Sequence, residues 1–241
     1  MIRFNFTSLL FFLLFFSLKQ FPQNKIEFST ELFRIYLGDK LLTVESINGI
    51  EIYSKEFQNP FAYSFDLDSD GIDEYLVKDS IESNDSAEYL LYIYNLLDTF
   101  YLSAEINSGF IEPYETFSGE IEGLIIVSGN SDFSYLNEGS EFKSLPINCW
   151  RFEEGEIYLV NEELYEIFIT ENENILMKLE PEGINNCGSS LRVKSLLTSA
   201  YINYLHAGEI ASAENLLSTF YLCEDLESFK EKLDALFITE N

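Results

Sequence analysis

The sequence predicts an α+β protein in which an antiparallel β-rich domain is followed by C-terminal helices. Over residues 25–182, short apolar or alternating runs recur between Gly, Asn, Asp and Ser, a pattern typical of strands joined by tight turns. Aromatic residues make up 16% of the 241 residues, and Tyr and Phe favour strands. Beyond residue 190 the apolar residues recur at helical spacing, which predicts a helical element over residues 191–238.

Residues 1–20 have the composition of a secretory signal peptide. Arg3 supplies a basic start, and Leu9 to Leu18 is apolar apart from Ser17. This run suits a signal-peptide core and is shorter than the about 20 apolar residues of a transmembrane helix. No small-x-small cleavage site follows, so an uncleaved signal anchor is an alternative. We therefore predict export to the periplasm, the cell surface or the medium, with membrane attachment only through an uncleaved leader.

The chain is strongly acidic, with a formal net charge of −28 and a pI near 4.1. Nucleic-acid binding needs a basic face, and docking on anionic lipid needs basic residues near the membrane, so the composition argues against both. A solvated, self-repelling surface accounts for the charge without any special role. For an exported protein we expect a protein or a glycan of the cell envelope as the partner.

The strands are expected where the runs are longest. We place them at Leu32–Tyr36, Lys40–Ser46, Ile50–Phe57, Tyr75–Lys78, Tyr89–Tyr94, Phe100–Ile106, Leu124–Ser128, Trp150–Phe152, Glu156–Val160, Leu164–Ile169 and Ile175–Leu179. Asn48-Gly49 lies between the second and third of these and is a strong β-hairpin signal.

The most specific pattern in the chain is FDLDSDGIDE at residues 65–74. Acids stand at alternate positions, and the glycine after them has no Cβ to resist the positive φ of a sharp turn. Calcium takes roughly six to eight oxygen ligands, which a tight coil of such a chain can supply. The alternative is a solvated acidic turn, because Asp-Gly is also an ordinary turn dipeptide. The pattern predicts a calcium site with the side chains of Asp66, Asp68, Asp70 and Glu74 and the backbone carbonyl of Ile72 as ligands.

The flanking residues favour a turn between strands over a helix-loop-helix calcium hand. Such a hand needs a bidentate Glu at loop position twelve, where this chain has Val77. Phe61 to Phe65 alternate like a strand, and Tyr75 to Val77 form an apolar run with β character. The ion would therefore join two strands and would act on the fold rather than on a substrate.

The stretch FDLDSDGIDEYLV resembles the calcium loop of FG-GAP or VCBS-type repeats, the blade unit of integrin-α-like β-propellers. The family pattern D-x-D-x-D-G-x-x-D/E matches at Asp66, Asp68, Asp70, Gly71 and Glu74, with Phe65 and Tyr75-Leu76-Val77 as the apolar flanks. The resemblance implies blade-like antiparallel sheets, calcium in the loop, and a binding or adhesion role.

A faint internal repeat is consistent with blades. IDEYLV from Ile72 aligns with IEGLII from Ile121, where the ladder of acids is gone, and GEIYLV from Gly155 is a weaker third copy. The alternative is that apolar strand runs after an acid are common. At about 40 residues a unit the chain has room for roughly three or four, so we expect a small or incomplete propeller, or a curved antiparallel sheet.

The C-terminal segment is expected to contain three helices. Two are separated near Ala207-Gly208, where glycine suits the end of a helix, and a third runs from Asp225 to Phe237 with Asp225 as its N-cap. The first pair is similar to part of a tetratricopeptide repeat, with matching residues at Tyr204, Gly208 and Ala213. Because such arrays need about three repeats, a helical cap packed on the β-rich domain is favoured over a peptide-binding array.

Histidine and cysteine give little support to a catalytic or zinc site. His206 is the only histidine and lies at a predicted helix end, which favours a structural role over a zinc site or a Ser-His-Asp triad. Cys149, Cys187 and Cys223 are too scattered for a zinc cluster. A Cys149–Cys187 disulfide is one interpretation for an exported protein, and three buried free thiols are another. No catalytic residue is predicted.

The favoured hypothesis is an exported calcium-binding protein with a binding or adhesion role at the cell surface or in the periplasm. The alternative is an interaction scaffold that uses the helical hairpin. A hydrolase with a pair of acids is a third hypothesis, but among 42 acidic residues a carboxylate pair carries no information.

Overall fold

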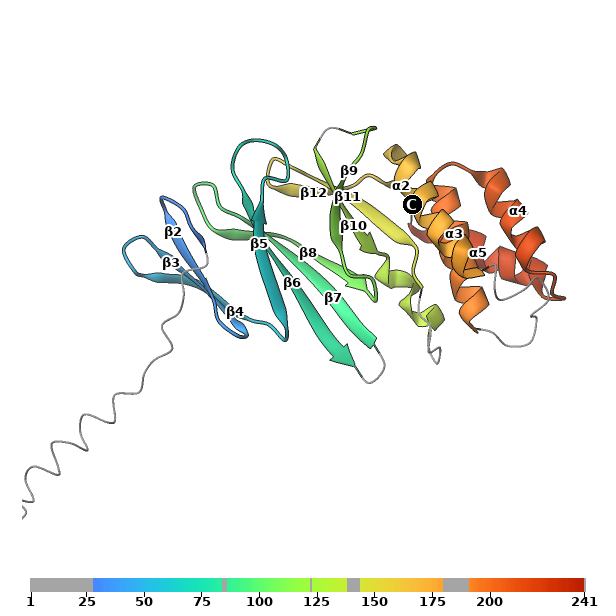
Figure 1. Cartoon of the computed structure of the whole chain (residues 1–241), viewed down its shortest axis with the longest axis horizontal. Helices are drawn as coiled ribbons and strands as arrows, with labels where there is room; N and C mark the ends of the chain where they lie inside the picture. The colour runs from blue at the N-terminus through green and yellow to red at the C-terminus, as the bar shows by residue number, and fades with distance from the viewer. Residues whose placement is uncertain (1–27, 84–85, 122, 138–143, 180–190, 241) are drawn as a thin grey trace, which may run out of the picture. The chain divides into compact units, whose positions relative to one another are not determined.

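The computed structural model describes residues 28–83, 86–121, 123–137, 144–179 and 191–240. They form three four-stranded antiparallel sheets followed by helices, which confirms the predicted α+β class (Figure 1). The chain divides into two compact units, residues 1–57 and 58–241. The predicted signal peptide lies outside the described residues. Within the described part of the chain, each helix is too short or too polar to cross a membrane.

The described part of the first unit is a single antiparallel sheet. Its strands β1 (Phe28–Ser29), β2 (Phe33–Leu37), β3 (Leu41–Ser46) and β4 (Glu51–Glu56) are hydrogen-bonded in that order. The hairpin predicted from Asn48-Gly49 is confirmed, because Gly49 has a φ of 76° and the Ser46 N–H donates to the Ile50 carbonyl. One face of the sheet carries the buried side chains of Phe33, Ile35, Leu42 and Val44.

The second unit begins with the second sheet, an up-and-down meander. Its strands are β5 (Pro60–Phe65), β6 (Glu74–Ser83), β7 (Ser86–Asn95) and β8 (Tyr101–Gly109), paired in chain order. The alternation at Phe61 to Phe65 and the three strands predicted between Tyr75 and Ile106 are thereby confirmed. The hairpin from β5 to β6 contains the acidic loop.

The third sheet is another meander and forms the middle layer of the second unit. Its strands β9 (Tyr114–Phe117), β10 (Leu124–Gly129), β11 (Ile147–Glu153) and β12 (Glu156–Leu159) are paired consecutively. All 6 residues of β10 are buried. Leu124 and Ile126 pack against the second sheet, and Ile125 and Val127 pack with Phe168 on the opposite side. The third sheet is therefore covered on both faces.

Helix α2 (Tyr165–Leu179) follows the short 3-10 helix η2 (Asn161–Glu163) and stands where two strands were predicted. The strands predicted at Leu164–Ile169 and Ile175–Leu179 are wrong, since both segments belong to this one helix or its start. Its buried residues recur every three or four positions, which is the helical period. They are Phe168, Asn172, Ile175 and Leu179. The Glu and Asn residues between them, which suggested a turn, lie mostly on the solvent side of the helix.

The three predicted C-terminal helices are confirmed as α3 (Leu191–His206), α4 (Ile210–Phe220) and α5 (Leu226–Glu240). The chain turns between α3 and α4 at Gly208, which has a φ of 72°. Polar side chains of α3 dock the helix beside the third sheet. Ser195 Oγ accepts the N–H of Ser144 at 3.1 Å, and Asn203 Oδ1 accepts the N–H of Ile147 at 3.0 Å. The segment that enters β11 is therefore held by this helix.

His206 is the last residue of α3, and its side chain is neutral at physiological pH. Its side chain is buried, and burial lowers its pKa to about 4. Asn161 Oδ1 accepts the N–H of Cys149 at 2.7 Å, so its Nδ2 faces His206 Nε2 at 3.4 Å. His206 Nε2 must then be unprotonated, so that its lone pair can accept this contact from the Asn161 amide. The structural role expected of His206 is therefore that of a neutral acceptor rather than of a cation at a helix end.

Acidification is expected to destabilise the protein through His206. Histidine in the unfolded chain titrates near 6.5 and folded His206 near 4, so the unfolded state binds more protons between these values. The contribution of His206 to stability therefore falls as the pH drops through this window, by roughly 2–3 kcal/mol. Urea unfolding of wild type and His206→Gln over pH 4–6.5 measures the loss, and the variant should lack this part of it. Parallel pH profiles of the two proteins would contradict the account.

The cysteines differ from both interpretations drawn from the sequence. Cys149 is a free thiol on β11, and its side chain is fully buried, so the Cys149–Cys187 disulfide is wrong. Cys223 is disulfide-bonded, so three free thiols are also wrong. Cys187 itself lies outside the described residues. Cys149 packs with the apolar residues between the third sheet and α2.

Iodoacetamide is expected to leave Cys149 unmodified in the folded protein and to modify it after unfolding without reductant. The side chain is 0% exposed, and burial raises the pKa of its thiol, so the reactive thiolate is scarce. Cys223 should stay unmodified until reductant is added. Peptide mass spectrometry distinguishes these states. A peptide joining Cys149 to another cysteine, or labelling of Cys149 in the native protein, would contradict the structure.

Candidate metal centre

The acidic loop connects β5 to β6, the turn between strands that its flanking residues predict. Phe65 pairs with Glu74, so the chain leaves one strand and returns to its neighbour. Ser69 and Gly71 both have positive φ, at 62° and 89°. These left-handed residues coil the loop tightly, and a side chain at Ser69 makes this conformation unfavourable in isolation.

Three carboxylates of the loop come together. Asp66, Asp68 and Glu74 each place an oxygen within 4.8 Å of the others, so they could hold a metal ion. Asp66 Oδ2 accepts the N–H of Gly71, and Glu74 Oε2 accepts the N–H of Leu67, both at 3.0 Å. Asp66 Oδ1 is buried and has no hydrogen-bond partner among the described residues. A buried, unpartnered carboxylate oxygen beside other carboxylates is costly, and a cation would satisfy it.

Asp70, the remaining predicted side-chain ligand, stands outside this cluster. Asp70 Oδ1 accepts the N–H of Ile72 at 2.7 Å, and the Asp70 side chain is exposed. Short Asp side chains often make such local bonds to the backbone two residues on. The structure therefore brings together Asp66, Asp68 and Glu74 from the predicted set.

Two carboxylates of the cluster, Glu74 and Asp68, have raised pKa values when no cation is bound. Burial raises the pKa of Glu74 to about 7, and the charges of Asp68 and Asp70 add to this effect, whereas the hydrogen bond from Leu67 opposes it. Glu74 is 2% exposed, so desolvation is the expected main cause. The pKa of Asp68 is raised as well, first by burial and then by Asp70. A positive ion would reverse these shifts.

The loop is attached to the third sheet at two points. Leu67 is buried in the core between the two sheets, and its carbonyl accepts the N–H of Leu124 at 3.4 Å. The backbone N–H of Glu154, in the turn from β11 to β12, donates to the Asp68 carboxylate. An ion in the cluster would fix this contact between the sheets. The sequence shows only a Glu-Gly turn signal at Glu154 and does not predict its contact with Asp68.

The internal repeat has a partial structural counterpart. IDEYLV and IEGLII lead into β6 and β10, which are the second strands of their sheets, whereas GEIYLV leads into β12, a fourth strand. The loop before β10 reads SGEIEG at residues 118–123 and lacks the three alternating Asp. Only the first two copies therefore occupy equivalent positions, and the acids are confined to one of them.

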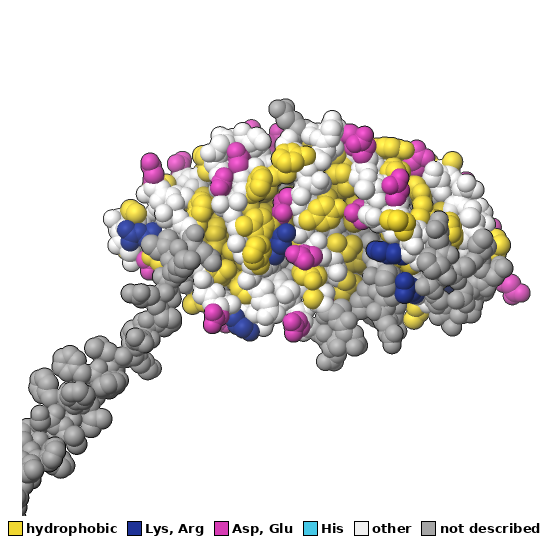
Figure 2. All heavy atoms as spheres, viewed as in Figure 1, with side chains coloured by type: hydrophobic (Ala, Val, Ile, Leu, Met, Phe, Trp, Pro, Cys, Tyr) yellow, Lys and Arg dark blue, Asp and Glu magenta, His cyan; other side chains and the backbone are white. Residues whose placement is uncertain are grey.

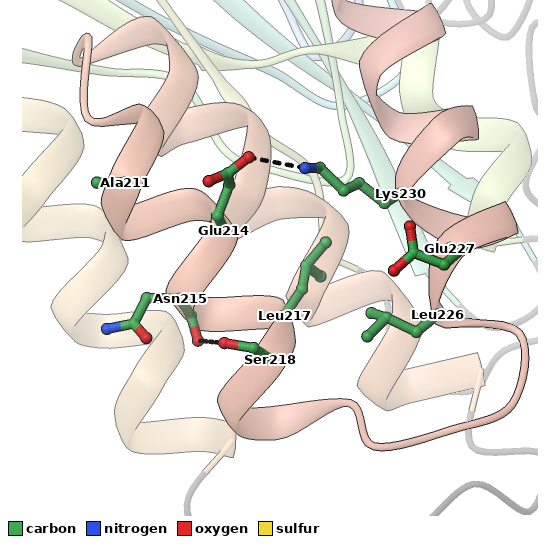
Figure 3. Close-up of a pocket in the computed structure, with 8 residues that line it drawn as sticks. All are labelled: Ala211, Glu214, Asn215, Leu217, Ser218, Leu226, Glu227 and Lys230. Carbon is green, nitrogen blue, oxygen red and sulfur yellow. Dashed lines mark hydrogen bonds and ion pairs between the residues drawn. The ribbon is translucent and has the colours of Figure 1, made fainter.

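The helical element has a groove between α4 and α5, with a volume of about 570 Å³ (Figure 3). Glu214 of α4 and Lys230 of α5 point toward one another and form an ion pair at 2.7 Å. The groove is lined by Ala211, Glu214, Asn215, Leu217, Ser218, Leu226, Glu227 and Lys230.

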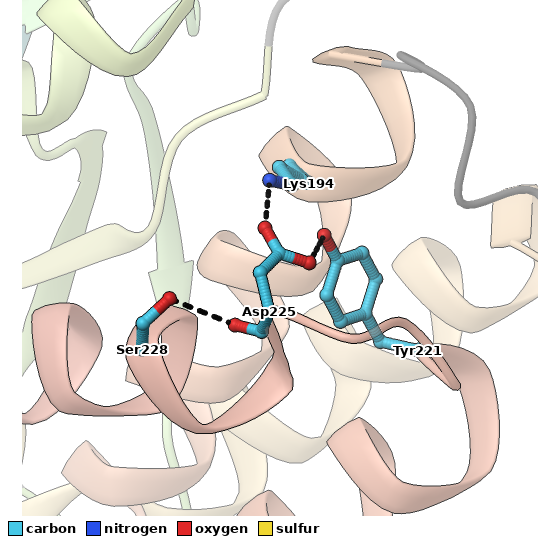
Figure 4. Close-up of polar contacts among 4 residues, drawn as sticks. All are labelled: Lys194, Tyr221, Asp225 and Ser228. Carbon is cyan, nitrogen blue, oxygen red and sulfur yellow. Dashed lines mark hydrogen bonds and ion pairs between the residues drawn. The ribbon is translucent and has the colours of Figure 1, made fainter.

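A polar cluster joins α3 to the start of α5 (Figure 4). Lys194 Nζ donates to Asp225 Oδ2 at 2.9 Å, and the Tyr221 hydroxyl donates to Asp225 Oδ1 at 2.8 Å. Lys194 also lies 5.4 Å from the ring centroids of Tyr221 and Phe229. Asp225 precedes α5 as predicted, and its carboxylate makes these contacts. Lys194 and Asp225 neutralise one another, which indicates that the cluster supports the structure by joining α3 to α5.

No family model matches this chain, and neither a curated protein nor a solved structure is similar to it. The resemblances to FG-GAP or VCBS-type repeats and to a tetratricopeptide repeat therefore rest on this chain's own residues.

Without a divalent cation, the contribution of Glu74 to stability is expected to fall as the pH rises from 4.5 to 7, opposite in sign to the contribution of His206. A glutamate in the unfolded chain titrates near 4.5, whereas folded Glu74 holds its proton to about 7. The folded state therefore binds more protons in this window and loses stability as they leave, on the order of 2 kcal/mol. Urea unfolding in chelator, compared with Glu74→Gln, isolates this contribution. A pH-independent difference between the two proteins would be the contrary result.

Proposed function

We propose that the acidic loop binds calcium and that the ion clamps the β5–β6 hairpin to the third sheet. The observation that carries the proposal is the cluster of Asp66, Asp68 and Glu74, with Asp66 Oδ1 buried and unpartnered. The ion supplies the positive charge that the cluster lacks. Asp70 and the carbonyl of Ile72 are the ligands expected to complete the site.

The donor set favours calcium over other biological cations. All the side-chain ligands are carboxylates, which suit hard cations, whereas structural zinc prefers Cys and His. Magnesium demands near-octahedral geometry and keeps several waters. A loop in which Asp70 and the Ile72 carbonyl would join the three clustered carboxylates as oxygen ligands suits the larger and more adaptable calcium ion. Calcium is therefore expected to bind more tightly than magnesium.

We further propose that the protein is exported and binds a protein or glycan of the cell envelope. Three consecutive four-stranded meanders have the connectivity of propeller blades, which supports the resemblance to FG-GAP or VCBS-type repeats. The disulfide at Cys223 supports an oxidising compartment. In Figure 2, acidic side chains are scattered over the viewed face, and hydrophobic side chains gather between them over the strands, so surface for a partner is available.

Binding of the labelled protein to isolated envelopes of its source tests this role. The bound fraction is expected to fall to background in chelator and to recover with calcium. The same loss is expected for Asp68→Ala in the presence of calcium. Envelope binding that is unchanged by chelator would reject a calcium-dependent adhesion role, even if the loop binds the ion.

The groove between α4 and α5 favours a second candidate, an interaction scaffold built on the helices. Lys230→Glu would replace the ion pair with Glu214 by a repulsion and change the charge of the groove. Envelope binding that is lost in this variant and retained in Asp68→Ala would favour the scaffold. Point variants are sharper than deletion of the helices, because Asn203 of α3 holds the backbone of Ile147 before β11.

A further inference from the structure

A second groove lies between the edge strand β9 and helix α2. In the part of the chain that the structure describes, β9 pairs only with β10. Tyr114 of β9 donates its hydroxyl to Glu171 of α2 at 2.9 Å, so strand and helix are neighbours. The groove has a volume of about 190 Å³. Its lining is Tyr114, Thr116, Phe117, Ser118, Glu166, Ile167, Thr170 and Glu171.

Among the described residues, the outer edge of β9 has no backbone partner. Within the described residues, the backbone of β9 makes its hydrogen bonds in the ladder with β10 and in no other backbone contact. Phe117, at the end of the strand, is 74% exposed. Unpaired strand edges are normally covered or kept short because they pair with other chains. An open edge beside a helix is also where extended peptides add as a further strand.

The chemistry of the groove selects for positive charge. Glu166 and Glu171 contribute carboxylates from α2, and Glu120 approaches from the loop after β9 to accept the N–H of Glu166 at 3.3 Å. The lining contains no Lys, Arg or His. Tyr114 and Phe117 add aromatic surface, which also attracts cations. A backbone ladder combined with these acids fits an extended chain with basic side chains.

We propose that this groove binds an extended basic segment of a partner protein, which pairs with β9 and places a Lys or Arg side chain at Glu166 and Glu171. The proposal names a partner for the binding role above and rests on that role, but it does not depend on the calcium cluster. A second copy of the chain is disfavoured, because pairing β9 with β9 would bring the same acids of two strongly acidic molecules together.

The test uses a fluorescent peptide, acetyl-Lys-Thr-Lys-Thr-Lys-Thr-amide, and fluorescence anisotropy at physiological salt. The same peptide N-methylated at alternate residues keeps the charge and loses the ladder, so it should bind at least about tenfold more weakly. Glu166→Lys and Glu171→Lys should each weaken binding by about tenfold. Glu231→Lys, the same charge change at an exposed residue of α5 outside the groove, should change it by less than about twofold.

Equal affinity for the methylated peptide, or equal weakening by Glu231→Lys, would show attraction to the acidic surface at large and overturn the proposal. A concentration-dependent dimer that Phe117→Asp abolishes would assign the edge to a second copy and also overturn it. Thermal melts confirm that each variant is folded. Calcium titration of the same samples separates the two proposals: calcium binding without peptide binding rejects only the groove, and the reverse rejects only the calcium clamp.

Discussion

Asp66→Asn is expected to abolish the stabilisation by calcium and to leave the chelated protein at least as stable as the wild type. Asparagine keeps an oxygen for the N–H of Gly71 and removes a charge next to Asp68 and Glu74. For a site with a Kd on the order of 10⁻⁴ M, about 10 mM calcium stabilises by roughly 2.7 kcal/mol. That corresponds to about 5–10 °C in Tm. In the variant, calcium affinity should fall by about 100-fold or more.

Asp73→Ala is the matched control for Asp66→Asn. Asp73 lies in the same loop, but it is exposed, and its carboxylate accepts the Ser64 hydroxyl at 2.9 Å outside the cluster. Scanning calorimetry with chelator and with calcium measures both variants. The control should keep the full calcium shift. A full shift in Asp66→Asn, or a chelated Asp66→Asn protein several degrees less stable than the wild type, would speak against the repulsive cluster.

Gly129→Ala is expected to destabilise the protein by about 4 kcal/mol. A Cβ at this position would lie 2.4 Å from the carbonyl oxygen of Ser108 and 3.1 Å from the side chain of Ile111. The N–H of Gly129 also donates to Ser108 Oγ at 2.8 Å. This is the place where β10 meets the end of β8, and a backbone oxygen cannot retreat without separating the strands. Overpacking at a backbone contact is harder to relax than overpacking against a side chain.

Gly119→Ala provides the comparison for Gly129→Ala. Gly119 lies in the loop before β10, has no heavy atom within 4 Å of an added Cβ, and does not need a positive φ. The substitution should be neutral or stabilising by up to about 1 kcal/mol, because alanine restricts the unfolded chain. Urea unfolding curves measure both variants. If Gly129→Ala were as stable as Gly119→Ala, β8 and β10 could not approach as closely as described.

The sequence predicted best those elements whose signal is local. Asn48-Gly49 and the alternation at Phe61 to Phe65 each specify a hairpin or a strand within a few residues. Helix α2 was missed because its apolar residues are separated by Glu and Asn, so two short β-like runs obscured the helical period. Strand β9 was missed because Tyr114 to Phe117 is too short to show alternation. The groove between α2 and β9 could not be predicted without either element.

The candidate metal centre shows the same limit. The alternating Asp and the Gly predicted an acidic coil, and the structure confirms a cluster at Asp66, Asp68 and Glu74. The bond from the Ile72 N–H to Asp70 competes with ligation and could not be predicted from spacing alone. The contact that Glu154 makes with Asp68 comes from the third sheet, about 80 residues further along the chain. Such long-range contacts decide whether an ion in the loop can link the β5–β6 hairpin to another sheet.

Calorimetric titration of the chelated protein with calcium tests the central claim most directly. We expect saturable binding of one ion per chain with a Kd of about 10⁻⁴–10⁻³ M, much weaker binding of magnesium, and loss of the calcium signal in Asp68→Ala. The absence of saturable calcium binding, or binding that Asp68→Ala leaves unchanged, would contradict it.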